Sequence, residues 1–267
     1  MSSIGAPLRV LQVTDTHLFP DANSRLVGVD TRATLAATLD AALSKGAPDL
    51  LLLTGDLAED PQTEAYAALE AIVQQRFSGD LLCVPGNHDD PARSGLFERR
   101  EWFAGDWGVL GLDSRVANAE GGRVAEAELR RLLERIDAAQ QPNLLIAVHH
   151  PPLELASPLD HGRIENGREL LAELGARGAV RAILFGHVHQ AVEAQIGTLR
   201  LFGTPSSCVQ FKPLRTRFAL DLDSPSSTPG WRWLTLGSDG SFASEVQRLD
   251  AAALGPEFRP VIGSATS

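Results

Sequence analysis

The sequence predicts an α/β fold, and three observations support this prediction. Short apolar runs of strand length alternate with amphipathic stretches as far as Phe185. Several of these runs are apolar throughout, which is typical of strands that are buried on both faces of a parallel sheet. After Phe185 the pattern changes to a series of short strands joined by turns rich in glycine, proline and serine. We therefore expect a front half of β-α-β units, a β-rich back half and no linker between them.

The elements of the front half are predicted from local patterns. A strand over residues 8–13 is followed by a helix over 31–43, on which leucines recur every four residues along one face. A second helix, over 61–73, begins with a proline, which suits the first position of a helix. Further helices are expected over 125–136, which has an apolar face, and over 165–174. The other front-half strands are expected at residues 50–53, 81–84, 109–112, 144–148 and 180–185.

The back half is expected to consist almost entirely of strands. A serine- and proline-rich segment, residues 224–230, is interpreted as a hairpin loop. We expect one domain over residues 1–250 and a loosely ordered C-terminal tail over 251–267. The predicted strands are 192–196, 199–202, 217–222, 231–236 and 242–246.

Composition and charge exclude several classes of protein. The chain has 267 residues, of which 43% are hydrophobic and 22% charged, so it can bury a sizeable core. Its net charge is −10, from 24 lysines and arginines against 34 aspartates and glutamates, which argues against a duplex nucleic-acid binder. No apolar run approaches the roughly 18–20 residues of a membrane span. An anionic substrate therefore needs local positive charge, which a bound metal ion can supply.

Cysteine usage and the N-terminal segment indicate a cytoplasmic protein. The two cysteines, Cys83 and Cys208, lie far apart in the sequence and form no Cys-x-x-Cys pattern. We therefore expect no disulfide framework, which agrees with a reducing compartment. Residues 1–7 have neither the basic region nor the apolar region of a secretory signal.

Side chains with nitrogen or oxygen donors follow five of the predicted strands. In an open α/β sheet, ligands bind at the carboxyl ends of the strands, so we expect these donors to meet at one edge. Imidazole, carboxylate and amide donors without a thiolate suit manganese, iron or zinc. The Asp-x-His and His-x-His spacings place alternate residues on the same side of an extended chain. The five motifs are Asp15-Thr16-His17, Gly55-Asp56, Gly86-Asn87-His88-Asp89, His149-His150-Pro151 and Gly186-His187-Val188-His189.

Each motif alone also has a purely structural interpretation. A single histidine after a strand is usually a capping or core residue, and a single Gly-Asn-His is often a turn. Asp56 alone can be an N-cap of the helix that follows. Five such coincidences at five strand ends are far less probable together, so we favour a metal site.

In this order, and with no ligand position substituted, the five motifs resemble those of the calcineurin-like metallophosphoesterases. The resemblance extends from about residue 8 to residue 222, which is most of the chain. A narrower resemblance links the chain to bacterial class III 3′,5′-cyclic-AMP phosphodiesterases. It rests on LVGVDT at residues 26–31, LDS at 112–114, PSSCVQFKP at 205–213 and PGWRWL at 229–234.

The resemblance implies a fold and a metal centre. The fold is a four-layer α/β/β/α sandwich with two central mixed β-sheets. The cofactors are two divalent metal ions per chain, iron and/or manganese, with zinc as a further possibility. Of the pair before Pro151, His149 is the ligand by the family motif. The first metal is expected to bind Asp15, His17, Asp56 and His189, and the second to bind Asp56, Asn87, His149 and His187, with Asp56 bridging the two.

The resemblance also implies a reaction. A hydroxide between the metals attacks the phosphorus of 3′,5′-cyclic AMP, and His88 donates a proton to the departing 3′-oxygen, which gives 5′-AMP. An imidazole suits that role because it can gain and lose a proton near neutral pH. The catalytic residues are then His88, Asp56 and Asn87. The residues expected to contact the nucleotide are His17, Asp56, Asn87, His88 and His189.

Several residues have alternative interpretations. Asp89 either orients His88 or forms an ion pair within its loop, and His150 either supports the ligands or lines the pocket. His161 is interpreted as a surface-loop residue rather than an edge of the pocket. Cys208 is not expected to be a nucleophile because no base flanks it. The tryptophans at 231 and 233 share one face of a strand and are interpreted as core packing rather than base stacking.

Three other functions remain as alternatives to cyclic-AMP hydrolysis. One is a phosphodiesterase of broader specificity that acts on 2′,3′-cyclic nucleotides or other small phosphodiesters with the same metal core. A nuclease is disfavoured because the chain is acidic and has no basic tract. A non-catalytic binding scaffold need not retain the metal ligands, whereas every ligand position of the family motifs is present in this sequence.

Overall fold

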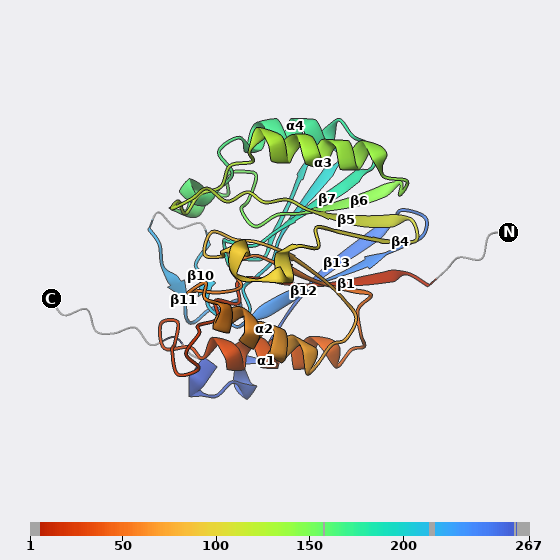
Figure 1. Cartoon of the computed structure of the whole chain (residues 1–267). Coiled ribbons are helices and arrows are strands. Elements are labelled where there is room, and N and C mark those ends of the chain that lie inside the picture. The colour runs from red at the N-terminus through yellow and green to blue at the C-terminus, as the bar shows by residue number, and fades with distance from the viewer. Residues whose placement is uncertain (1–5, 157, 214–216, 259, 261–267) are drawn as a thin grey trace.

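Two β-sheets lie face to face between two pairs of helices (Figure 1). This architecture comes from a computed structural model that describes residues 6–156, 158–213, 217–258 and 260. Helices α1 (Thr31–Leu43) and α2 (Thr63–Gln74) cover the outer face of one sheet. Helices α3 (Glu126–Ala138) and α4 (Gly167–Gly175) cover the outer face of the other. The predicted four-layer α/β/β/α sandwich is confirmed.

Both sheets are mixed, as predicted. In the five-stranded sheet β1, β2 and β3 are parallel, and β12 and β13 add antiparallel strands beside β1. The order is β13 (Phe242–Arg248), β12 (Gly230–Leu236), β1 (Leu8–Val13), β2 (Leu50–Thr54), β3 (Asp80–Val84). In the six-stranded sheet four parallel strands lie between two antiparallel edge strands. The order is β4 (Glu101–Ala104), β5 (Trp107–Gly111), β6 (Asn143–Ala147), β7 (Val180–Phe185), β9 (Leu199–Gly203), β8 (Val192–Ile196).

The apolar strands separate three layers of core. In β1, Val10 faces the space between the sheets while Leu11 packs under the α1/α2 pair. In β2, Leu50 and Leu52 face the other sheet and Leu51 packs toward the helices. Successive side chains of a strand point to opposite faces, so an uninterrupted apolar run is the pattern that a sheet covered on both faces requires. A third cluster lies between the six-stranded sheet and the α3/α4 pair.

Three predicted elements differ in the structure. Helix α2 begins at Thr63, after an N-cap at Gln62, so Pro61 lies before the helix rather than at its first position. Of the predicted strand at 217–222 only β11 (Leu220–Asp221) forms, and it pairs with β10 (Gln210–Phe211), which was not predicted. Residues 224–230 are not a hairpin loop, because they connect β11 to β12, which belong to different sheets.

Short elements complete the chain. Strand β4 was not predicted because it has only four residues, of which Trp102 alone is buried. In the described part of the tail, the backbone carbonyl of Glu257 accepts a hydrogen bond of 2.9 Å from the Asp30 amide. The 3-10 helices are Pro91–Arg93, Gly95–Phe97, Pro158–Gly162, Ala251–Ala253 and Pro256–Phe258.

Some predictions fall outside the described residues. Residues 1–5, which belong to the segment interpreted as lacking a secretory signal, lie outside them. So do residues 261–267, the end of the predicted loosely ordered tail. The domain boundary at residue 250 stays a prediction. Among the described helices, none has the length and apolarity that crossing a bilayer requires.

Candidate metal centre

The five predicted motifs lie in loops at the carboxyl ends of β1, β2, β3, β6 and β7, and these loops meet at one edge of the sandwich. Neighbouring loops are joined by backbone hydrogen bonds. The amides of Asp15 and His17 donate to the carbonyls of Gly55 and Asp56, each over 3.0 Å. The prediction that distant donors converge at the ends of the strands is confirmed.

The backbone turns sharply at five of the candidate ligands. Their φ angles are +53° at Asp15, +46° at His17, +49° at Asp56, +66° at His187 and +50° at His189. The expectation that Asp-x-His and His-x-His are extended was therefore wrong. Asp15 and His17 do reach the same volume, whereas His187 and His189 join different groups of donors. A left-handed conformation in a residue other than glycine costs of order 1–3 kcal/mol, and such strain clusters at functional sites.

A first set of donors comes from the loops after β1 and β7. The Nε2 atoms of His17 and His189 lie 3.2 Å apart. The His189 Nε2 atom also lies 3.4 Å from Asp15 Oδ1. All three side chains are buried. Converging nitrogen and carboxylate donors at these separations form a cage of the kind that a divalent transition metal binds.

A second set comes from the loops after β3, β6 and β7. The His149 Nε2 atom lies 3.2 Å from Asn87 Oδ1 and 3.3 Å from His187 Nδ1. Asp56 lies between the two sets, because its Oδ2 atom is 3.2 Å from His149 Nε2 and 3.9 Å from His17 Nε2. One carboxylate oxygen thus faces both groups of donors. The residues present fit a pair of divalent ions that share Asp56.

Hydrogen bonds hold the other atoms of these side chains in place. The two Asp15 carboxylate oxygens accept the backbone amide of His187, each over 3.1 Å. Asp56 Oδ1 accepts the amide of His88 over 2.9 Å. The Nδ1 atom of His149 lies 2.9 Å from the Thr54 carbonyl oxygen. Partners of this kind fix the orientation and the tautomer of a metal ligand.

Nearby charge opposes the effect of burial on the pKa of His149 and of Asp56, and adds to it at His187. Burial opposes protonation of His149, but the Asp56 and Asp15 carboxylates outweigh it and raise the pKa of His149 to about 9. Burial and the positive charge of His149 lower the pKa of His187 to about 3. Burial disfavours ionised Asp56, but His149 and His17 hold the pKa of that carboxyl well below its usual value. The site without metal therefore has ionised Asp56 and a proton on His149.

Glu59 is a part of the site that the sequence analysis missed. Its Oε2 atom lies 2.7 Å from Nδ1 of His17 and 3.3 Å from Nδ1 of His88. It follows Asp56 by three residues in the same loop, and that short spacing was the only signal for it in the sequence. With Nδ1 facing Glu59, the opposite Nε2 atom of each ring points away from the carboxylate.

Neither interpretation of Asp89 was correct. Its buried carboxylate accepts the backbone amides of Gly86, Leu57 and Ala58 and the hydroxyl of Tyr66. Burial, with the charge of Asp56, raises the pKa of Asp89 to about 6. Asp89 thus ties the loop after β3 to the loop after β2 without contacting the His88 ring.

The remaining candidates lie around the centre rather than in it. His150 is buried behind the ligands, with Nδ1 2.8 Å from Ser114 Oγ and Nε2 3.1 Å from the Glu120 carbonyl oxygen. Burial raises the pKa of the Cys208 thiol to about 12, which agrees with the expectation that it is not a nucleophile. Residues Trp231 and Trp233 pack in the core under α1 and α2, as expected.

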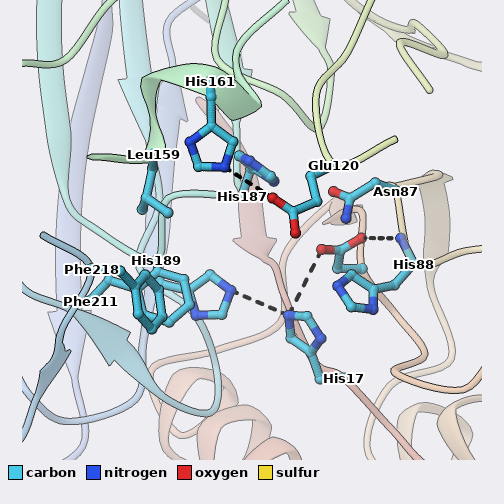
Figure 2. A pocket seen from close by; sticks show the side chains of 11 residues that line it. His17, Asn87, His88, Glu120, Leu159, His161, His187, His189, Phe211 and Phe218 are labelled. Carbon is cyan, nitrogen blue, oxygen red and sulfur yellow. Dashed lines mark hydrogen bonds and ion pairs between the residues drawn. The ribbon is translucent and has the colours of Figure 1, made fainter. Parts of the chain in front are cut away.

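A cavity of about 420 Å³ opens over the donors (Figure 2). His161 lines it, although its side chain is 62% exposed, so the edge of the pocket was the better interpretation. The sequence analysis gave no role in the site to Glu120, Leu159, Phe211 or Phe218, which also line the cavity. All five residues expected to contact the nucleotide line it as well; they are His17, Asp56, Asn87, His88 and His189.

Comparisons with known proteins agree with this geometry. Residues 8–191 match the family model described as calcineurin-like phosphoesterase. The chain is 36% identical over 262 residues to 3′,5′-cyclic adenosine monophosphate phosphodiesterase CpdA of Escherichia coli K12, and 33% identical over 262 residues to the CpdA of Haemophilus influenzae. Each alignment covers 94% of both chains. A dimetal phosphatase from Danio rerio has a similar fold, with a TM-score of 0.64 at 12% identity over 90% of this chain and 99% of that one.

Proposed function

The chain belongs to the calcineurin-like phosphoesterase family, and from this premise we propose that it hydrolyses 3′,5′-cyclic AMP to 5′-AMP with two divalent metal ions. One observation carries the proposal: two sets of donors from five strand ends meet at the single Asp56 carboxylate, at the floor of a cavity. Hydrolysis of a phosphodiester by a two-metal site requires that arrangement. The relatives named as cyclic-AMP phosphodiesterases match nearly the whole chain, which supports the choice of substrate.

The proposed ligands are those that form the two sets of donors. Asp15, His17 and His189 hold one ion, Asn87, His149 and His187 hold the other, and Asp56 contributes to both. We infer iron or manganese, with zinc as a further candidate, because the donors are imidazole, carboxylate and amide without thiolate. When bound, the ions supply Lewis acidity, which acidifies a water molecule and offsets the charge of the phosphoryl oxygens.

The side chains of the protein position the phosphate and move one proton. His88 stands at the wall of the cavity with its side chain 35% exposed, while its backbone amide is tied to Asp56. Glu59 holds Nδ1 of the ring, so the proton for the leaving 3′-oxygen of the ribose comes from Nε2. Proton donation by a positioned imidazole contributes about 10²- to 10⁴-fold in rate.

The compartment and the type of partner are part of the same proposal. Both cysteines are free and buried, which supports a reducing cytoplasm. The net charge of −10 favours a small nucleotide over a nucleic-acid strand as the substrate.

The test measures the product and the substrate range of the purified protein. The protein is stripped of metal and reloaded with Mn²⁺, and its rates on 3′,5′-cyclic AMP, 3′,5′-cyclic GMP and 2′,3′-cyclic AMP are compared. We expect turnover of 3′,5′-cyclic AMP to 5′-AMP, loss of that activity in Asn87→Ala and no loss in Asn23→Ala, an exposed asparagine outside the cavity. A higher kcat/KM for 2′,3′-cyclic AMP would instead favour the phosphodiesterase of broader specificity. Unchanged turnover in Asn87→Ala would contradict the assignment of ligands.

A further inference from the structure

We propose that Phe218, with Phe211 beside it and Leu159 facing the two rings, forms a slot that binds the base of the cyclic nucleotide by stacking. The inference rests on the proposed function and adds to it the part of the site that holds the nucleoside. The metal donors account only for the phosphate and ribose end of the substrate. The cavity extends beyond these donors to an apolar region that none of the assigned roles uses (Figure 2).

A row of aromatic rings leads from the metal centre to the edge of the cavity. The ring of Phe211 stacks on that of His189, with centroids 4.2 Å apart and an angle of 12° between the planes. The ring of Phe218 meets Phe211 edge to face at 4.7 Å and 60°. Because His189 belongs to the first set of donors, the row begins beside the phosphate position. A nucleotide whose phosphate lies at the metals can therefore extend its base along these rings.

The exposure of Phe218 supports a ligand at this position. Phe218 is 57% exposed, the largest fraction among the large hydrophobic side chains that are exposed in the described part of the chain. The others, such as Ile196 at 44%, lie outside this cavity. An exposed aromatic ring in a concave site beside polar groups is typical of a ligand-binding surface. Stacking of an aromatic base would remove that ring from water.

The side chain of Leu159 completes the slot. Leu159 lies in the 3-10 helix Pro158–Gly162, and its side chain lies on the same side of the view as the two phenylalanines and points toward them (Figure 2). Next to it, Nε2 of His161 lies 2.9 Å from Glu120 Oε2, so the rim beyond the apolar walls is polar. A flat ring between an aromatic face and an aliphatic side chain fits this chemistry. Every base has a π-face, so the slot contributes affinity for a nucleoside rather than a choice among bases.

The experiment compares two substrates that differ only in the base. Steady-state kinetics of the Mn²⁺-loaded protein are measured on 3′,5′-cyclic AMP and on an abasic analogue, 1-deoxyribose 3,5-cyclic phosphate. The variants are Phe218→Ala, Phe218→Tyr, which keeps a stacking ring, and Ile196→Ala, which removes an exposed apolar side chain elsewhere. The Kd of 5′-AMP is measured by calorimetry for each protein as a readout that does not depend on turnover.

We expect Phe218→Ala to raise KM for cyclic AMP and Kd for 5′-AMP by about 5- to 100-fold, the range that base stacking on one ring supplies. We expect kcat to change by less than about threefold, because stacking acts on binding in the ground state and transition state alike. The constants for the abasic analogue should be unaffected by Phe218→Ala. Phe218→Tyr keeps a stacking ring and should lose much less affinity than Phe218→Ala, and Ile196→Ala should change neither constant.

Two outcomes overturn the slot. One is an unchanged KM for cyclic AMP in Phe218→Ala, and the other is an equal rise of KM for both substrates, which would assign Phe218 to the phosphate end. Failure of the proposed function can be distinguished from failure of the slot, because the unaltered protein would then not turn over cyclic AMP at all.

Discussion

Glu59 connects the metal centre with the proton donor through a single carboxylate. The Nδ1 atoms of His17 and His88 both face its Oε2 atom, and the two rings meet edge to face with centroids 5.1 Å apart. One acidic side chain thus fixes the tautomer of a proposed ligand and that of the proposed acid. This arrangement makes His88 testable separately from the metals, because its hydrogen bond to Asp56 comes from the backbone amide, which a replacement of the ring retains.

Replacing His88 is expected to lower the rate without loss of metal. In His88→Ala the amide that orients Asp56 remains, so the metal content should stay unchanged. We expect kcat on cyclic AMP to fall by about 10²- to 10⁴-fold, because the ribose 3′-oxygen would leave without a proton. Bis(p-nitrophenyl) phosphate, whose leaving group needs no proton, should lose much less. Kinetics on both substrates and metal analysis test this, and an equal loss on both would contradict the role of His88 as the acid.

Sequence patterns predicted the donor side chains that converge in the site better than they predicted the walls of the cavity. Asp15, His17 and Asp56 occur in short motifs at the ends of apolar strands, where pattern and position both indicate a site. Phe218 comes from a loop and Leu159 from a short 3-10 helix, and neither segment has a periodic pattern, so only the tertiary structure brings them to the cavity. The left-handed backbone at the ligands was also not predicted, because no local propensity of aspartate or histidine requires it.

At the scale of elements, the two helices beneath the five-stranded sheet begin differently. The Asp30 side chain caps α1 by accepting the amide of Ala33 over 3.0 Å, and it also pairs with Arg25 at 2.9 Å. Gln62, at the same position of α2, makes no side-chain bond to its helix. The backbone amides at the start of α2 therefore depend on other partners or on water.

This difference predicts unequal effects of two alanine substitutions. Asp30→Ala should lower the free energy of unfolding by about 0.5–2 kcal/mol, the usual contribution of a side-chain N-cap. Gln62→Ala should change the free energy of unfolding by less than about 0.5 kcal/mol, because the Gln62 side chain is exposed and does not cap the helix. Urea denaturation of the metal-loaded proteins measures both. An equal effect of the two substitutions would contradict the capping role of Asp30.

Elements were predicted best where burial imposes a pattern. Strands β1, β2 and β7 are covered on both faces, and their largely apolar sequences located them closely. Strand β4 is an edge strand and β10 has two residues, so neither carries a pattern long enough to detect. The start of α2 was misplaced because Pro61 is compatible with a first helical turn but does not require one.

At the scale of the whole molecule, buried polar side chains and the metal centre both join the two sheets. Arg232 of β12 is fully buried and donates to the carbonyl of Gly203, on β9, and to Thr204. Thr204 in turn donates to Gln12 of β1 over 2.7 Å. The two sets of donors also combine loops from both sheets. Occupation of the metal site is therefore expected to stabilise the association of the sheets.

Metal binding is expected to release protons and to weaken as the pH falls. The pKa of His149 is raised to about 9, so this ring is protonated at pH 7.5 in the protein without metal and must lose its proton to bind an ion. The pKa of His187 is lowered to about 3, so that ring contributes none. Affinity for Mn²⁺ should therefore rise with pH up to about 9 and fall about tenfold for each unit below it.

Calorimetric titration of the metal-free protein in two buffers of different ionisation enthalpy measures the number of protons released. We expect at least about one proton at pH 7.5. Thermal unfolding with and without Mn²⁺ gives a second measurement, in which the metal should raise Tm. Binding without proton release, or an affinity independent of pH, would contradict the protonation of His149.

The position of β12 has a consequence for how the protein is made. Leu8 of β1 pairs with Leu236 of β12, so the first strand leaves the ribosome long before its partner on that side has been synthesised. Until then one edge of β1 has no neighbouring strand. In the folded protein the last four residues of β1 are buried. An unpaired apolar edge is prone to aggregate. The nascent chain must therefore wait until residues 230–236 have been synthesised before the sheet below the first set of donors can close, and chaperones have that interval in which to act.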